Sequence, residues 1–168
     1  GARAHAIARE QWMGHLSEDR MAAFMREAIR EGQKALPECR PNPPVGCVLV
    51  RADAIIARGY TQPPYQPHAE PHALGQVEGE LGDVAVFVTL EPCAFHQRTP
   101  SCAATLITRK VGAVYVAMID PHPRNQGRGV EMLRAAGIPV VTDVLAGEAR
   151  PHLAPYLTGP DGSAPVGW

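Results

Sequence analysis

The sequence lacks three features that would each indicate a special class of protein. Its purely apolar runs, such as 84–88, are far too short to span a bilayer, so no membrane partner is expected. The formal net charge is only −1, whereas a domain that binds nucleic acid through its phosphates is usually strongly basic. The first 16 residues contain no continuous apolar segment, which argues against a secretory signal.

The residues that are present suit one domain with a substantial core. The chain has 168 residues, of which 45% are apolar. Its four cysteines do not indicate a disulfide scaffold, because such scaffolds are short chains with little core. Cys47 lies in an apolar run and is predicted to be a buried thiol, whereas Cys93 and Cys102 lie in a polar stretch that favours metal binding. A reducing compartment, the cytoplasm, is therefore expected.

The pattern of apolar residues predicts an α/β domain. We divide the chain into an N-terminal extension (1–16), the domain (17–157) and a Gly/Pro-rich tail (158–168). Periodicity and turn residues predict helices over 18–36, 68–78, 100–110, 129–136 and 147–157, and strands over 45–51, 54–60, 84–90, 113–119 and 138–144. A hairpin followed by alternating strands and helices predicts a mixed sheet of about five strands, covered by helices on both faces.

Three predicted helix starts and strand ends carry metal-binding side chains. His68 opens a helix, Cys93 follows a buried strand, and Cys102 lies at the start of the next helix. One imidazole and two thiolates form a three-ligand zinc set that leaves the fourth position open for water, as in catalytic zinc sites. A helix N-terminus favours the thiolate form of a cysteine and a nearby anion.

Glu70 lies two residues after His68, where it can take a proton from water and deliver protons to a ring nitrogen and a leaving amine. The H-x-E and Pro-Cys elements form the pattern of zinc deaminases, which usually have two residues between their cysteines. Here eight residues, 94–101, separate them. Two alternatives stay open: ordinary thiols with a capping histidine, and a closed structural zinc site with His72 or His96 as fourth ligand. His72 is expected to pack or to support a metal ligand rather than to bind the metal.

From residue 19 to residue 157, the chain resembles the deaminase domain of bifunctional riboflavin-biosynthesis proteins of the RibD type, within the cytidine deaminase-like superfamily. The eight-residue gap between the cysteines is the RibD-type spacing. The matching stretches are PNPPVGCV (41–48), HAE (68–70), VTLEPC (88–93), RTPSC (98–102), DPHP (120–123), GRG (127–129) and LRAAGI (133–138).

The resemblance implies a cytidine deaminase-like three-layer α/β/α sandwich and one Zn²⁺ per chain, held by His68, Cys93 and Cys102. It implies that zinc-bound hydroxide attacks the amino-bearing carbon of a small heterocycle, that Glu70 shuttles protons, and that ammonia leaves. It also implies a homodimer or homotetramer. The family's companion reductase domain cannot fit in the roughly ten residues after Leu157. A stand-alone or excised deaminase domain is therefore expected.

Five positions are candidates for substrate binding. By resemblance, Asn42 contacts the substrate and Arg98 its phosphate. Thr61, Phe95 and His122 stand where the family usually has His, His and Asn, and Gln97 replaces a usual Gly. These departures suggest a substrate other than the standard diaminopyrimidine ribose phosphate, such as a related pyrimidine, a purine or a non-phosphorylated heterocycle of salvage or secondary metabolism. The alternative is a divergent riboflavin enzyme whose phosphate is held by Arg98 and His122.

Two functions of other classes remain open. One is a non-catalytic binding module stabilised by zinc. The other is a nucleic-acid deaminase that acts on a flipped base. Only a modest basic set supports the second: Arg98, Arg109, Lys110, Arg124 and Arg128.

Overall fold

The computed structural model describes residues 16–96 and 99–157, to which all structural statements here refer. One five-stranded sheet has the order β2-β1-β3-β4-β5. Strand β1 pairs antiparallel with β2 and β3, whereas β3, β4 and β5 are parallel. The strands are β1 (Gly46–Arg51), β2 (Ala54–Tyr60), β3 (Val84–Leu90), β4 (Ala113–Met118) and β5 (Val140–Val141). The predicted mixed sheet of five strands is confirmed.

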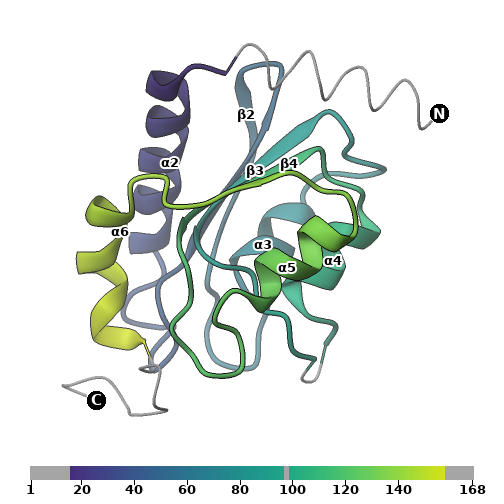
Figure 1. The fold of residues 1–168 in the computed structure, drawn as a ribbon. Coiled ribbons are helices and arrows are strands. Elements are labelled where there is room, and N and C mark those ends of the chain that lie inside the picture. The colour runs from purple at the N-terminus through teal and green to yellow at the C-terminus, as the bar shows by residue number, and fades with distance from the viewer. Residues whose placement is uncertain (1–15, 97–98, 158–168) are drawn as a thin grey trace.

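Helices cover both faces of the sheet, as predicted. Figure 1 shows α2 and α6 together on one face, with α3, α4 and α5 on the other. Parallel strands need crossover connections, and α4 and α5 supply them between β3, β4 and β5. No helix among the described residues is long and apolar enough to cross a membrane. The helices are α2 (Glu18–Gln33), α3 (Ala69–Leu74), α4 (Cys102–Thr108), α5 (Arg128–Ala135) and α6 (Ala146–Leu153), followed by a 3-10 turn, η1 (Ala154–Tyr156).

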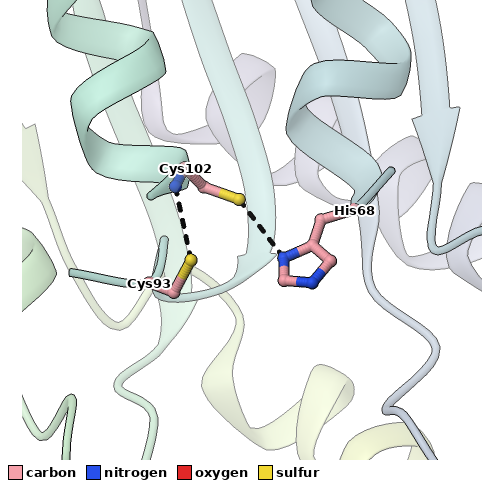
Figure 2. Close-up of side chains that lie close together, drawn as sticks. All are labelled: His68, Cys93 and Cys102. Atoms are coloured by element: carbon pink, nitrogen blue, oxygen red, sulfur yellow. Dashed lines mark hydrogen bonds between the residues drawn. The ribbon is translucent and has the colours of Figure 1, made fainter. Parts of the chain in front are cut away.

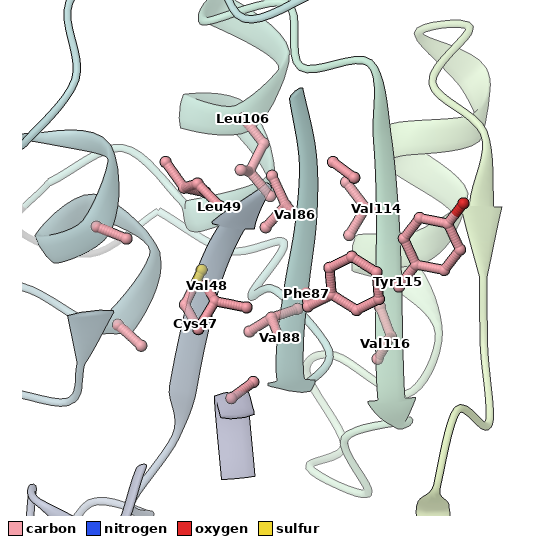
Figure 3. Close-up of a cluster of buried hydrophobic side chains, with 14 of the residues drawn as sticks. Cys47, Val48, Leu49, Val86, Phe87, Val88, Leu106, Val114, Tyr115 and Val116 are labelled. Atoms are coloured by element: carbon pink, nitrogen blue, oxygen red, sulfur yellow. The ribbon is translucent and has the colours of Figure 1, made fainter. Parts of the chain in front are cut away.

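The core is built on the three central strands. Every residue of β3 and β4 is buried, as expected for strands covered on both faces. Val48, Phe87 and Tyr115 occupy one row across the sheet, and the rings of Phe87 and Tyr115 stack with centroids 4.5 Å apart (Figure 3). Phe24 of α2 packs on Phe87 at 5.4 Å. The predicted burial of Cys47 is confirmed, since its side chain is 0% exposed.

Several helix boundaries differ from the prediction. Helix α2 ends at Gln33 instead of residue 36, because the next three N–H groups, those of residues 34–36, bond to the carbonyl three residues back as in a 3-10 turn. Helix α4 does not begin at residue 100: Ser101 is its N-cap, and its hydroxyl accepts a hydrogen bond from the Ala104 N–H at 3.1 Å. Helix α3 is also shorter than the predicted range 68–78, since it ends at Leu74.

The last strand is much shorter than predicted. The pattern predicts pairing over 138–144, but only Val140 and Val141 pair with β4. Pro139 has no N–H to donate, although its carbonyl accepts from the Val114 N–H at 3.0 Å. Asp143 has φ +61°, which is outside the β region and ends the strand.

Most of the predicted domain, 17–157, falls within the described residues. The predicted tail (158–168) and all but the last residue of the predicted extension (1–16) lie outside them. The carboxyl ends of β3 and β4 are followed by the segments 91–96 and 119–127. Because parallel strands end at the same edge of a sheet, these two segments meet there, and this edge is where α/β folds commonly bind ligands.

Candidate metal centre and active site

Three donor side chains converge near this edge of the sheet, as Figure 2 shows. His68 is the N-cap residue of α3, Cys93 lies in the loop after β3, and Cys102 is the first residue of α4. Their donor atoms all lie within 4.8 Å of one another, and His68 Nδ1 is 3.3 Å from Cys102 Sγ. The backbone N–H of Cys102 donates to Cys93 Sγ at 3.3 Å. Residues far apart in sequence therefore form one compact donor set.

This donor set fits zinc in both geometry and charge. With ligand bonds of roughly 2.0–2.3 Å, two donors of a tetrahedral site lie about 3.5–3.8 Å apart. A hydrogen bond from the Cys102 thiol lowers the pKa of Cys93 to about 4. The same bond, together with burial, raises the pKa of Cys102 well above its usual value. The protein alone thus sustains one thiolate, and a divalent cation would balance the second.

The site opens to solvent on the histidine side. His68 is exposed, Cys93 is half-buried and Cys102 is buried. Neither His72 nor His96 places a ring nitrogen in the donor group, which contains only three of the described residues. The Nδ1 atom of His72 instead accepts from the Tyr60 N–H at 3.1 Å, so this histidine joins α3 to β2. The arrangement suits a metal ion with an accessible fourth position rather than a closed structural site.

Glu70 supplies a protonatable group beside the donors. Its side chain is only 4% exposed, in the first turn of α3. Burial, followed by the negative charge of Cys93, raises the pKa of Glu70 to about 7, and the positive charge of His68 is the largest cause that opposes the shift. A carboxyl group in this environment can both accept and release a proton near neutral pH.

Phe95 and His122, two of the predicted substrate-binding residues, lie together where the loops after β3 and β4 meet. Their ring centroids are 5.6 Å apart, and the Arg124 guanidinium lies 4.5 Å from the centroid of Phe95. The Nδ1 atom of His122 accepts from the Arg124 N–H at 3.0 Å, which leaves Nε2 as the ring's donor when the imidazole is neutral. Arg124 was predicted only as part of a basic set, yet it contributes a cation to this group.

The other three predicted substrate-binding residues differ in their placement. The hydroxyl of Thr61 is occupied internally: it donates to the Pro43 carbonyl at 2.9 Å and accepts from the Val45 N–H at 3.0 Å. Thr61 therefore holds the loop that follows Asn42, which is itself half-buried. The prediction for Arg98 lies outside the described residues.

Two residues of the predicted basic set have structural partners. Arg109 donates to the backbone carbonyls of Leu74, Val77 and Gly79, and Lys110 pairs with Glu80 at 3.2 Å. These contacts stabilise the connection between α3 and β3. They remove two of the five cations from the set that was considered for nucleic acid.

The comparison with protein families agrees with this site. The family described as "Cytidine and deoxycytidylate deaminase zinc-binding region" matches residues 18–118, a span that contains Glu70 and all three donors. The match covers more than half of the chain, so the protein belongs to this family. By class it is a domain of this zinc-binding deaminase family, and its sheet and helices have the expected cytidine deaminase-like arrangement.

Individual relatives point to the RibD branch. The riboflavin biosynthesis protein RibD of Chlamydia trachomatis is 47% identical over 134 residues, which cover 80% of this chain and 36% of that protein. The structure of Acinetobacter baumannii RibD, form 2, superposes with a TM-score of 0.79 at 37% identity, over 83% of this chain and 40% of that one.

A third relative has both activities in its name. It is the Thermotoga maritima diaminohydroxyphosphoribosylaminopyrimidine deaminase/5-amino-6-(5-phosphoribosylamino)uracil reductase, with a TM-score of 0.78 and 36% identity over 83% of this chain and 40% of that one. This chain spans little more than a third of the length of the first curated relatives it matches. The RibD-type resemblance is confirmed.

Proposed function

We propose that the chain catalyses the hydrolytic deamination of an amino-substituted pyrimidine that carries a ribose phosphate, the step named for its Thermotoga relative. The observation that carries the proposal is the open three-donor set with the buried carboxyl of Glu70 beside it. In this reaction a C–N bond of the ring carbon breaks, a C–O bond forms, one water is consumed and ammonia leaves.

His68, Cys93 and Cys102 would hold one zinc ion. Bound zinc supplies Lewis acidity that lowers the pKa of water to near neutrality. Glu70 accepts a proton from water on a carboxylate oxygen and donates it to the ring nitrogen next to the reacting carbon. It then takes the second proton, from the hydroxyl group that has added to that carbon, and gives it to the leaving amine as the C–N bond breaks. Its burial keeps this carboxyl close to the donors and away from bulk solvent.

The residues around Phe95 support a phosphorylated substrate. The ring can stack on a heterocycle, while the Arg124 guanidinium and the Nε2 atom of His122 offer a positive charge and a donor for a phosphate. Asn42 and Arg98 are proposed as further substrate contacts by resemblance. Thr61 is proposed to act through the 43–45 loop, because its hydroxyl is already used there.

A second candidate is a deaminase of a non-phosphorylated pyrimidine or purine. Phe95 favours it, because an aromatic side chain cannot donate a hydrogen bond to a phosphate. The two candidates differ in one measurable quantity, the ratio of kcat/KM for a substrate with and without its phosphate. A ratio well above ten supports the phosphorylated substrate, and a ratio near one supports the second candidate.

The activity itself is tested by ammonia release from a panel of diaminopyrimidine ribose phosphate, cytosine, adenine, guanine and their nucleosides. We expect Glu70→Ala to lower turnover by about 10²–10⁴-fold while zinc content stays near one per chain. Glu78→Gln, a change at an exposed carboxylate after α3, is the control and should keep full turnover. Full turnover in Glu70→Ala would exclude the proton-shuttle role.

The zinc-stabilised binding module makes the opposite prediction. It requires zinc uptake with no ammonia release from any member of the panel. The homodimer or homotetramer expected from the resemblance is a separate proposal, which light scattering on the purified chain tests. The predicted cytoplasmic location also stays a prediction.

A further inference from the structure

One buried amide lies directly behind the loop that carries Cys93. Asn125 is 0% exposed, although it belongs to a polar connection between β4 and α5. Burying an amide costs free energy unless its donors and acceptor are satisfied. The hydrogen-bond partners of the Asn125 amide therefore show which segments the residue holds in place.

These partners are the peptide groups on both sides of Cys93. Asn125 Oδ1 accepts from the Ala94 N–H at 3.2 Å, and Nδ2 lies 3.4 Å from the Pro92 carbonyl. Nδ2 also donates to Asp120 Oδ2 at 3.3 Å. The loop has no regular secondary structure to fix it, so these bonds, together with the one that the Cys93 carbonyl accepts from the Ala103 N–H at 3.1 Å, set the direction of the backbone from which the Cys93 thiol projects.

The segment that carries Asn125 is in turn held by Glu91. This buried carboxylate accepts from the backbone N–H groups of Asp120 at 3.2 Å, Gly127 at 2.9 Å and Val130 at 3.0 Å. The two segments thus hold each other reciprocally: Glu91 binds the 120–130 segment, and Asn125 binds the 92–94 segment. A shift of either segment breaks hydrogen bonds in both.

We propose that Asn125 is a positioning residue of the metal centre, which sets the placement of Cys93 Sγ by binding the peptides before and after it. This rests on the proposed role of Cys93 as a zinc ligand. The same segment carries His122 and Arg124, which contact Phe95, so one anchor holds both a metal ligand and the proposed substrate-facing group. Groups that orient metal ligands typically change metal affinity by 10–100-fold when they are mutated.

The test measures zinc affinity by competition with a chromophoric chelator, and site geometry by the absorption spectrum of the Co²⁺-loaded protein. Asn125→Ala should weaken zinc binding by about 10–100-fold and alter the thiolate-to-cobalt and d–d bands. Arg109→Ala is the matched control, because it removes three hydrogen bonds from a loop at the other end of α4. It should lower thermal stability and leave affinity and spectrum unchanged.

A second pair keeps the test decisive if Asn125→Ala does not fold. Asn125→Asp retains the acceptor for Ala94 but points an oxygen at Asp120 and at the Pro92 carbonyl, so it should weaken zinc binding. Adding Asp120→Asn restores one donor, and the double variant should recover part of the affinity. If Asn125→Ala does not fold, the absence of this recovery in the double variant would overturn the proposal.

The remaining outcomes are also distinct. The proposal is overturned if folded Asn125→Ala keeps wild-type affinity and spectrum, or if Arg109→Ala weakens zinc binding as much. If the wild-type chain binds zinc but releases no ammonia, the proposed function fails while this comparison still stands. If the wild-type chain binds no zinc, both fail.

Discussion

The two sides of the metal centre are held in place by different physical means. On the histidine side, His68 precedes a short helix that packs directly against β2, where Gly59 allows close approach. On the cysteine side, Cys93 lies on an irregular loop that is held by hydrogen bonds with the buried Asn125 and with the Ala103 N–H. A helix needs only a fitting surface to be positioned, whereas a loop needs a partner for each of its peptide groups. The two sides should therefore respond to different mutations.

The largest effect is expected on the histidine side, from Gly59→Ala. A Cβ atom at residue 59 would lie 2.4 Å from the Ala69 carbonyl oxygen and 2.6 Å from the Ala73 nitrogen. These are backbone atoms, so the whole of α3 must move, and His68 and Glu70 move with it. We expect a loss of about 3 kcal/mol in the free energy of unfolding, together with weaker zinc binding. Denaturant unfolding and chelator competition measure the two quantities.

Gly147→Ala is the control for this change. Residue 147 lies in α6, and a Cβ atom there would meet nothing within 4 Å. It should leave zinc binding unchanged and stabilise the helix slightly, by about 0.5–1 kcal/mol. If Gly59→Ala were as mild as Gly147→Ala, close packing could not be what positions the histidine side.

The next largest effect is expected on the cysteine side, from Glu91→Gln. The glutamine side chain keeps one acceptor oxygen, but its NH₂ group faces a backbone N–H from which the wild-type carboxylate accepts. That buried N–H therefore loses its acceptor. The expected cost is about 2 kcal/mol in unfolding free energy, with weaker zinc binding because the 120–130 segment loosens. Glu148→Gln breaks a solvent-exposed ion pair with Arg26 and should change neither quantity measurably. Equal effects of the two substitutions would mean that Glu91 does not hold the 120–130 segment in place.

The same contrast explains what the sequence could predict. His68, Glu70 and Cys102 lie at or near helix starts, and a helix start can be read from local signals such as capping residues and apolar periodicity. The order of elements also predicts the mixed sheet, because hairpins and crossovers follow simple rules. These features depend on neighbours in the sequence, so one chain without relatives is enough to find them.

The supports of the Cys93 loop could not be predicted in this way. Asn125 and Glu91 look like ordinary polar residues next to a turn and after a strand, and their burial arises only when the ends of β3 and β4 meet. Thr61 was expected to face substrate, but the approach of the 43–45 loop uses its hydroxyl. Contacts between distant segments determine all three roles, and local sequence patterns carry no signal for them.

Helix capping gives a smaller test that separates stability from metal binding. Ser101 caps α4, whose first residue is Cys102, and Ser17 caps α2 with a hydrogen bond to the Arg20 N–H at 3.2 Å. Replacing either serine by alanine should cost about 1 kcal/mol of unfolding free energy. Only Ser101→Ala should also weaken zinc binding, since fraying of α4 releases Cys102. If both variants bind zinc equally well, the first turn of α4 does not control the thiol.

The smallest effect is expected from Arg124→Ala. This change tests whether the 120–127 segment supports the Cys93 loop and contacts the substrate through different residues. The Arg124 guanidinium lies exposed over the ring of Phe95, and an exposed contact of this kind contributes about 0.5 kcal/mol. Unfolding and zinc affinity should hardly change, because Asn125 and Glu91 still hold the segment. The kcat/KM for a phosphorylated substrate should fall more than that for its unphosphorylated form. Arg150→Ala, on α6, should alter neither substrate. A zinc-binding defect in Arg124→Ala would mean that the substrate-facing group and the metal ligand cannot be separated.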